Sequence, residues 1–288
     1  MKQKYKGILC ILSSAFFFAL MSLFARLSGD ISVIQKTFFR NFIALIFATI
    51  VLFKNKPELH LNRECKIGLI ARATFGTIGV ICNLYAVDHL LLADATILNK
   101  LSPFFAILMG AMILGEKLKP FQVAAVLAAF GGALLVIKPG SGIIDAPAIV
   151  GLLGGFCAGT AYTMVRYLGN RNVPGPFIVF FFSAFSSITL LPYLIFSFDP
   201  MTAQQTLFIL LAGLSAAAAQ FSVTAAYCYA PAREISIFDY SQILFSALLG
   251  FMIFGQIPDA LSFVGYLVIL VTAIANFIFN NKQEQQAS

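Results

Sequence analysis

Long stretches of this chain carry no charged side chain, and this feature constrains the fold more than any other. Uncharged runs cover residues 7–25, 172–198, 200–232, 240–258 and 260–281. An α-helix needs about 20 mostly apolar residues to cross the hydrocarbon layer of a membrane. Only 11% of the residues are charged and 60% are apolar, whereas a soluble domain has about 25% charged residues. The sequence therefore predicts an all-α integral membrane protein.

Apolar runs and helix-breaking residues divide the chain into ten predicted transmembrane helices. These lie near residues 7–27, 34–53, 67–87, 92–114, 120–137, 148–168, 174–196, 204–229, 232–254 and 259–279. The loops between them are short and rich in turn-forming residues. The basic amino terminus resembles that of a signal peptide, but its apolar stretch is longer than a usual signal core and no small-residue cleavage site follows. We therefore expect this segment to be the first retained helix.

Lysine and arginine residues in the short loops predict the orientation, because cytoplasmic loops carry an excess of them. If the amino terminus is cytoplasmic, the segments on that side hold thirteen: Lys2, Lys4, Lys6, Lys54, Lys56, Arg63, Lys66, Lys117, Lys119, Arg166, Arg171, Arg233 and Lys282. The opposite loops hold only Lys138. We expect a multi-pass protein of a bacterial cytoplasmic (plasma) membrane with both termini cytoplasmic. The net charge of +7 reflects this bias, so we expect no nucleic-acid partner.

The two halves of the chain resemble each other at an offset of 140 residues. Residues 105–115 align with residues 245–255, and six of the eleven positions are identical. Each half holds five spans, an odd number, so the second half enters the membrane from the opposite side. Inverted repeats of this kind are a hallmark of secondary transporters, whose substrate site lies near the midplane between the repeats. The sequence predicts two inverted five-helix repeats, residues 1–140 and 141–288.

A set of short motifs recurs along the predicted helices. The fourth ends with Leu-Gly-Glu-Lys at 114–117, and the ninth ends with Phe-Gly-Gln at 254–256. Others are Phe-Phe-Arg at 38–40, Arg72 with Gly76, and Ser-Pro at 102–103. In their order and spacing these motifs resemble the drug/metabolite transporter superfamily, in particular its ten-helix EamA-type members, although Gln256 stands where the first repeat has Glu116. The resemblance implies a proton- or exchange-driven transporter of small metabolites, often an exporter.

Four charged side chains fall well inside the predicted spans: Arg40, Arg72, Lys100 and Asp239. A charge at the bilayer centre costs at least about 2.5–3.5 kcal/mol, so it needs partners or water. The fourth span begins near residue 92, which places Lys100 about 12 Å deep at 1.5 Å per residue. Asp239 lies seven residues into the ninth span and enters from the other face. The two side chains are therefore expected at similar depth near the midplane, on the walls of one central cavity.

Pro103 and the repeat alignment predict further polar groups at the same depth in the membrane as Lys100 and Asp239. A proline cannot bond to the carbonyl four residues earlier, which frees the carbonyl of Asn99 beside Lys100. The 140-residue offset aligns Asn99 with Asp239 and Lys100 with Tyr240. We interpret these four residues as a substrate or coupling site, with Asp239 as the proton-coupling carboxylate. The alternative is a buried Lys100–Asp239 ion pair that only fixes the packing of the helices.

The remaining polar residues of the spans give a weaker pattern. Arg40 and Arg72 either contact substrate or serve helix packing and gating. Together with Lys100 they form an excess of positive charge over Asp239, which favours an anionic or zwitterionic substrate such as an amino acid or related compound. We expect two further side chains, Tyr162 and Gln220, to line the cavity. Two more basic side chains, Arg26 and Lys36, lie nearer the membrane surface, where we expect them to extend to the headgroups.

These observations predict a secondary active transporter that works by alternating access. The alternatives are a channel, which would need a lining ring of charges or carbonyls, and a receptor or assembly protein of the membrane. Paired aspartates, a GxSG serine and a HExxH helix are all absent from the sequence, so we do not expect an enzyme. We expect no cofactor and no metal site. The expected partners are a small-molecule substrate, the lipid bilayer and a proton or counter-substrate, and a homodimer remains open.

Overall fold

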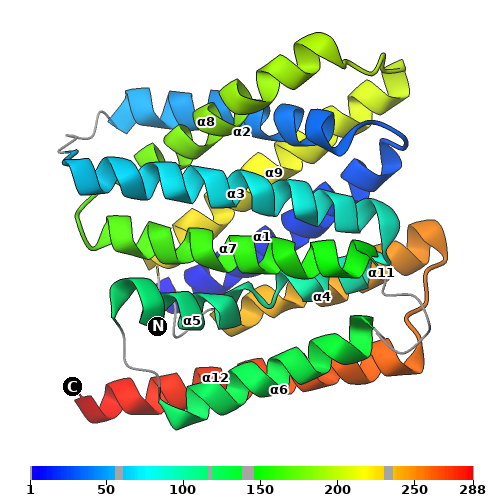
Figure 1. Ribbon diagram of the computed structural model, residues 1–288. Helices are drawn as coiled ribbons and strands as arrows, with labels where there is room; N and C mark the ends of the chain where they lie inside the picture. The colour runs from blue at the N-terminus through cyan, green and yellow to red at the C-terminus, as the bar shows by residue number, and fades with distance from the viewer. Residues whose placement is uncertain (1, 56–60, 116–118, 138–145, 230–235, 288) are drawn as a thin grey trace.

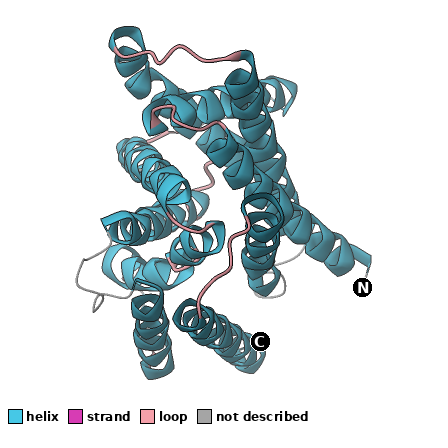
Figure 2. Ribbon diagram, turned by 90° about the vertical axis from the view of Figure 1, so that its right-hand side faces the viewer, coloured by secondary structure: helices cyan, strands magenta, loops and turns pink. Residues whose placement is uncertain are grey.

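Apolar helices make up the regular structure of the described part of the chain. The computed structural model describes residues 2–55, 61–115, 119–137, 146–229 and 236–287 (Figure 1). Within these residues nine helical segments are long and apolar enough to cross a membrane, and a tenth apolar segment, Phe238–Phe254, is shorter. Figure 2 shows the bundle turned by 90°, with the helices joined by short loops. The predicted all-α fold with ten spans is confirmed.

The helices follow the predicted spans to within a few residues. The first half of the chain forms α1 (Lys2–Leu27), α2 (Val33–Asn55), α3 (Arg63–His89), α4 (Leu92–Asn99), α5 (Ser102–Leu114) and α6 (Pro120–Ile137). The second half forms α7 (Ala146–Gly169), α8 (Gly175–Phe196), α9 (Ala203–Tyr229), the 3-10 helix η1 (Ser236–Tyr240), α11 (Ser241–Phe254) and α12 (Ala260–Ala287). The fourth span is thus made of α4 and α5, and the ninth of η1 and α11.

Helix packing has the symmetry of an inverted repeat. The first helix of each half packs along the third helix of the other half, so that α1 lies on α9 and α7 lies on α3. In the same way α5 on α7 matches α11 on α1, and α2 on α9 matches α8 on α3. Two further pairs join equivalent helices of the two halves, α2 with α8 and α6 with α12. Figure 1 shows these two pairs at opposite edges of the bundle. The predicted boundary between residues 140 and 141 falls outside the described residues and stays a prediction.

Two glycines end equivalent helices of the two repeats in the same way. Gly115 follows α5 and Gly255 follows α11, with φ values of 69° and 63°. Their backbone N–H groups donate to the carbonyls of Gly110 and Gly250. Glycine is favoured at such a helix end because it adopts the left-handed conformation without strain. These two positions are aligned in the 140-residue repeat, so the sequence match corresponds to a shared local structure.

The charge bias predicts which end of the bundle is extracellular, and cysteine labelling tests it. Both chain termini lie at the left of Figure 1, as an even number of spans requires, and the count of basic residues predicts that this end is cytoplasmic. In a variant without the five native cysteines, Asp30→Cys is expected to react with an impermeant reagent in intact cells, whereas Asn170→Cys reacts only after permeabilisation. Both positions are exposed. The reverse pattern would show that the orientation is inverted.

Candidate substrate-binding site

The fourth span is interrupted at the residue that the sequence places near the midplane. α4 ends at Asn99, Lys100 is its C-cap, and α5 begins at Ser102 with Pro103 in its first turn. Proline is favoured in the first turn of a helix, where its missing N–H costs no hydrogen bond. Pro103 therefore starts a second helical segment. The break places the Lys100 side chain between two helix ends.

The ninth span changes its helix type at the equivalent position. The 3-10 helix η1 ends at Tyr240, and α11 starts at Ser241. These residues align with Lys100 and Leu101 of the first repeat at the offset of 140. The residue aligned with Pro103 is Ile243, so this second interruption does not depend on a proline. Both spans are thus irregular at the same depth, which in a membrane is tolerated where the backbone is covered by protein or lines a cavity.

Lys100 and Asp239 meet directly at these two interruptions. The Lys100 Nζ lies 2.5 Å from the Asp239 Oδ2, and the two side chains are 9% and 28% exposed. The Tyr240 hydroxyl donates to the Lys100 carbonyl at 3.3 Å. Asn99, the last residue of α4, is half-buried beside them. The four residues predicted as one site therefore lie together, and the ion pair is closed rather than spread across a cavity.

Small residues let the neighbouring helices approach both interruptions closely. A Cβ atom on Gly155 of α7 would lie 2.6 Å from the Leu98 carbonyl oxygen, and one on Gly159 would lie 2.5 Å from the Ser102 carbonyl oxygen. The aligned residues on α1, Ala15 and Ala19, are fully buried. In lipid, where no hydrophobic force drives helices together, small side chains allow the close backbone packing that holds them. α7 therefore fixes the position of the break that carries Lys100.

Hydrogen bonds between α4 and α11 connect the two repeats around the ion pair. The Thr96 hydroxyl donates to the Ser246 hydroxyl at 2.8 Å, and both residues are buried. Nearer the helix ends, the Leu92 N–H donates to the Gln256 Oε1 at 3.0 Å. Gln256 is the position at which the first repeat has Glu116. Its neutral side chain serves as an acceptor for the first turn of α4, which gives this departure between the repeats a structural role.

Arg40, Arg72 and Tyr162 are the next of the predicted site residues. Arg40 donates to the Asn41 Oδ1 at 2.7 Å and lies 3.1 Å from the Met21 sulfur. Tyr162 is 54% exposed. Within the described residues, no hydrogen bond or ion pair joins either arginine to Lys100 or Asp239.

Arg72 is held by an aromatic ring and a glycine. Its guanidinium carbon lies 4.3 Å from the centre of the Phe182 ring, a cation–π contact. The guanidinium also occupies the space that a side chain at Gly76 would take, which explains the Arg72–Gly76 motif. Among the residues that the structure describes, the buried Nε of Arg72 has no hydrogen-bond partner. The last predicted residue, Gln220, lies half-buried on α9.

The expectation that Arg26 and Lys36 extend to the headgroups is wrong. The Lys36 Nζ lies 2.8 Å from both carboxylate oxygens of Asp88, and its side chain is only 2% exposed. Arg26 donates to the carbonyls of Val87 and Leu90. The half-buried carboxylate of Asp88 and the free carbonyls at the end of α3 thus provide partners inside the protein. The sequence places all these residues near one membrane surface but does not show that they face each other.

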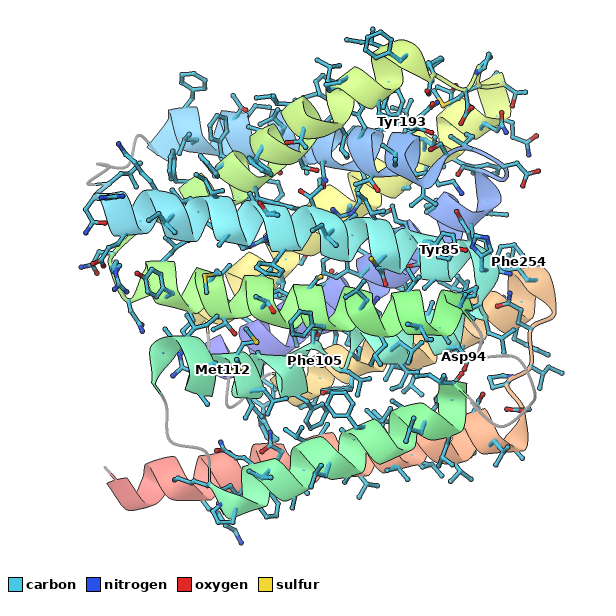
Figure 3. The ribbon with its side chains drawn as sticks, viewed as in Figure 1. Tyr85, Asp94, Phe105, Met112, Tyr193 and Phe254 are labelled. Carbon is cyan, nitrogen blue, oxygen red and sulfur yellow. The ribbon has the colours of Figure 1, made fainter. Side chains whose placement is uncertain are left out.

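Asp94 is a buried carboxylate that the sequence reasoning missed. It is 9% exposed and accepts a hydrogen bond of 2.6 Å from the Tyr266 hydroxyl. Figure 3 shows its side chain pointing toward the layer of α6 and α12. Asp239 is therefore one of several carboxylates inside the bundle. The only indication in the sequence is an acidic residue two positions after the start of a predicted span. Its tyrosine partner is 172 residues away, and no local pattern connects the two.

Comparisons with known proteins agree with this architecture. Residues 5–138 and 146–278 each match the model of the EamA-like transporter family. The pseudopaline exporter CntI of Pseudomonas aeruginosa is 31% identical over 272 residues, which cover 93% of this chain and 95% of that protein. A riboflavin transporter of Rhizobium johnstonii is 29% identical over 230 residues, covering 80% and 72%. A solved crystal structure with 17% identity has the same fold, with a TM-score of 0.65 over 96% of this chain and 98% of that one.

Proposed function

Because this chain belongs to the EamA-like transporter family of the drug/metabolite transporter superfamily, we propose that it is a secondary active transporter of a small anionic or zwitterionic metabolite, such as an amino acid or a related compound. The observation that carries the proposal is the Lys100–Asp239 ion pair between two interrupted, symmetry-related spans. Broken helices near the midplane form the substrate and ion sites of many transporters with inverted repeats.

The chemistry of the ion pair favours a substrate with a negative group. A carboxylate of the substrate can replace the Asp239 carboxylate at the Lys100 ammonium without leaving that cation unpaired. If the substrate also carries an amine, the amine pairs with Asp239, so both buried charges keep partners. This matters because a buried charge that loses its partner costs several kcal/mol. Arg72, whose buried Nε lacks a partner among the described residues, adds positive charge inside the bundle away from this pair.

Release of Asp239 would connect substrate binding to proton movement. A substrate that holds Lys100 and offers no amine leaves Asp239 as an isolated carboxylate in a poorly hydrated site, where protonation relieves the cost of the charge. The two five-helix halves then move around the α4–α11 contact to expose the site on either side of the membrane. If the substrate supplies its own amine, the same geometry favours exchange of one substrate for another.

The alternative is that the ion pair only fixes helix packing, and substitution of Asp239 distinguishes the two roles. Purified protein is first screened for ligands that raise its melting temperature, since binding to the folded state stabilises it by mass action. The panel holds amino acids, nucleotides, sugar phosphates and quaternary amines, together with pseudopaline and riboflavin, the compounds named for two relatives. In proteoliposomes, Asp239→Asn is expected to abolish proton-driven accumulation of the ligand but to retain counterflow exchange, which moves no net proton.

Asp30→Asn is a control of the same chemistry, because Asp30 is exposed in the loop between α1 and α2. Ligand accumulation in proteoliposomes that contain this variant is expected to equal that with the parent protein. If Asp239→Asn accumulates ligand as well as this control does, Asp239 is not the coupling residue.

A further inference from the structure

A group of charges closes one end of the bundle, the end that the loop charges predict to be extracellular. This outer charge cluster consists of Arg26, Lys36 and Asp88. Lys36 and Asp88 form a two-oxygen ion pair at 2.8 Å, and Arg26 donates to backbone carbonyls at the end of α3 and stacks on Phe254 at 5.0 Å. The cluster therefore ties the ends of α1, α2 and α3 together.

A small cavity of about 10 Å³, roughly the room that one water molecule needs, lies next to this cluster. It is lined by Met21, Ala25, Lys36, Arg40, Leu84, Ile209 and Ala212, which come from α1, α2, α3 and α9. Lys36 and Arg40 are one helical turn apart on α2, so both cations face the same space. The other lining residues are apolar. Lys36 therefore both lines the cavity and forms the ion pair with Asp88.

The charges around the cavity do not balance. Arg40 contacts a neutral amide oxygen and a thioether sulfur, and within the described part of the chain no carboxylate pairs with it. Asp88 is held by Lys36. Inside a membrane protein a cation without a negative partner is costly, and such residues usually mark the path of a substrate or ion. The cavity therefore has one positive charge more than its own carboxylate satisfies.

The second repeat lacks counterparts of the Lys36–Asp88 pair, although Arg26 aligns with Arg166. At the offset of 140, Lys36 aligns with Pro176 and Asp88 aligns with Cys228, and neither residue can form an ion pair. The packing differs in the same sense: α3 contacts both α1 and α2, whereas its counterpart α9 has no comparable contact with α7 or α8 among the described residues. Among the described residues, the Lys36–Asp88 pair therefore has no counterpart at the aligned positions of the second repeat.

We propose that Lys36 and Arg40 form an anion-binding subsite, separate from the Lys100–Asp239 pair, and that a bound anionic group opens the outer end by drawing Lys36 away from Asp88. The ligand is a carboxylate or phosphate group, which Arg40 binds through its planar fork and Lys36 binds as a point charge. The opening step rests on the proposed function, because its purpose is to admit or release an anionic or zwitterionic substrate.

The opening step is tested by the accessibility of the cavity wall. Leu84 is 1% exposed and lies one turn before Asp88 on α3, so Leu84→Cys in a variant without native cysteines reports on the cavity. Asp88→Asn is expected to speed modification of this cysteine by a water-soluble thiol reagent at least about tenfold, because it leaves the buried Lys36 charge without a partner. Glu64→Gln, which breaks the exposed Arg171–Glu64 pair at the opposite end, is the matched control and is expected to change nothing.

The anion-binding step is tested separately in the purified full-length protein. Inorganic phosphate is expected to raise the melting temperature above that in chloride at equal ionic strength. This rise is expected to disappear in Arg40→Gln and to persist in Lys100→Ala, so the result does not depend on transport through the Lys100–Asp239 site. Loss of transport in Lys100→Ala alone tests the proposed function and leaves this inference intact.

Three results would overturn the inference. The first is an unchanged labelling rate in Asp88→Asn. The second is a rise in melting temperature with phosphate that persists in Arg40→Gln. The third is the loss of that rise in Lys100→Ala. If Asp88→Asn does not fold, the exchange Lys36→Asp with Asp88→Lys retains the pair. The exchanged protein is then expected to keep the slow cysteine labelling of the parent. It is also expected to lose the rise in melting temperature with phosphate, since it places a carboxylate in the cavity. If that rise persists, the anion subsite is equally contradicted.

Discussion

Exchanging the two residues of the central ion pair, Lys100→Asp with Asp239→Lys, is expected to restore a stable fold without restoring transport. Either single substitution places two like charges next to each other, which breaks the pair, and breaking a buried pair costs about 3–5 kcal/mol or more. The double exchange keeps a pair across the 2.5 Å contact, so most of that stability returns. It places the cation on η1 and the carboxylate on α4, so a substrate carboxylate no longer meets a positive group in the same position.

The measurements are the melting temperature of the purified variants and substrate counterflow in proteoliposomes. The same exchange at Arg171 and Glu64 is the control, because this pair is exposed, with side chains 34% and 63% accessible. Exposed pairs contribute about 0–1 kcal/mol, so the control is expected to retain both stability and transport. Near-normal counterflow by the exchanged central pair would mean that the pair serves packing alone.

Adding a single methyl group at Gly159 is expected to destabilise the protein, although alanine is the better helix former. The new Cβ would lie 2.5 Å from the Ser102 carbonyl oxygen and 2.7 Å from the Phe105 Cβ. Alanine is favoured over glycine within a helix by up to about 1 kcal/mol, but overpacking typically costs about 1–3 kcal/mol. We expect Gly159→Ala and Gly155→Ala to lower the melting temperature and to reduce transport strongly, since both press on the break that positions Lys100.

Gly169→Ala is the matched control on the same helix. A Cβ at Gly169, the last residue of α7, would have no neighbour within 4 Å, so this variant is expected to be as stable and active as the parent. Melting temperature and counterflow are measured for all three variants. Equal values for Gly159→Ala and Gly169→Ala would show that α7 does not determine the position of the α4–α5 break.

The local predictions succeeded where a single short segment carries the information. Apolar runs gave the helices, because the length of a membrane span and its need for internal backbone hydrogen bonds leave few alternatives. The identical residues of the 105–115 and 245–255 stretches marked two helix ends with the same glycine conformation. Pro103 marked the irregular point of the fourth span, although the structure shows a complete break there and not only a freed carbonyl.

The predictions failed where two distant segments had to be matched. Lys36 was expected at the headgroups because its sequence position is near a membrane surface, yet its partner Asp88 lies 52 residues away on a neighbouring helix. Asp94 was overlooked because its partner Tyr266 belongs to the other repeat. In both cases the direction of a side chain around its helix decides whether it meets lipid, water or protein. A helix that is apolar on all sides has no distinct polar face, so its sequence gives little indication of that direction.

The sequence by itself determined the class of this protein, the number of its spans and its inverted repeat, because each follows from hydrophobicity, length and internal similarity. It also placed Lys100 and Asp239 at the same depth. Only the tertiary structure decided that these two side chains bind each other, that Arg72 stacks on Phe182, and that Lys36 pairs with Asp88. The depth of a residue in the membrane follows from its position along the helix, which the sequence gives. Its partners across the bundle depend on how each helix is rotated about its axis and packed against its neighbours.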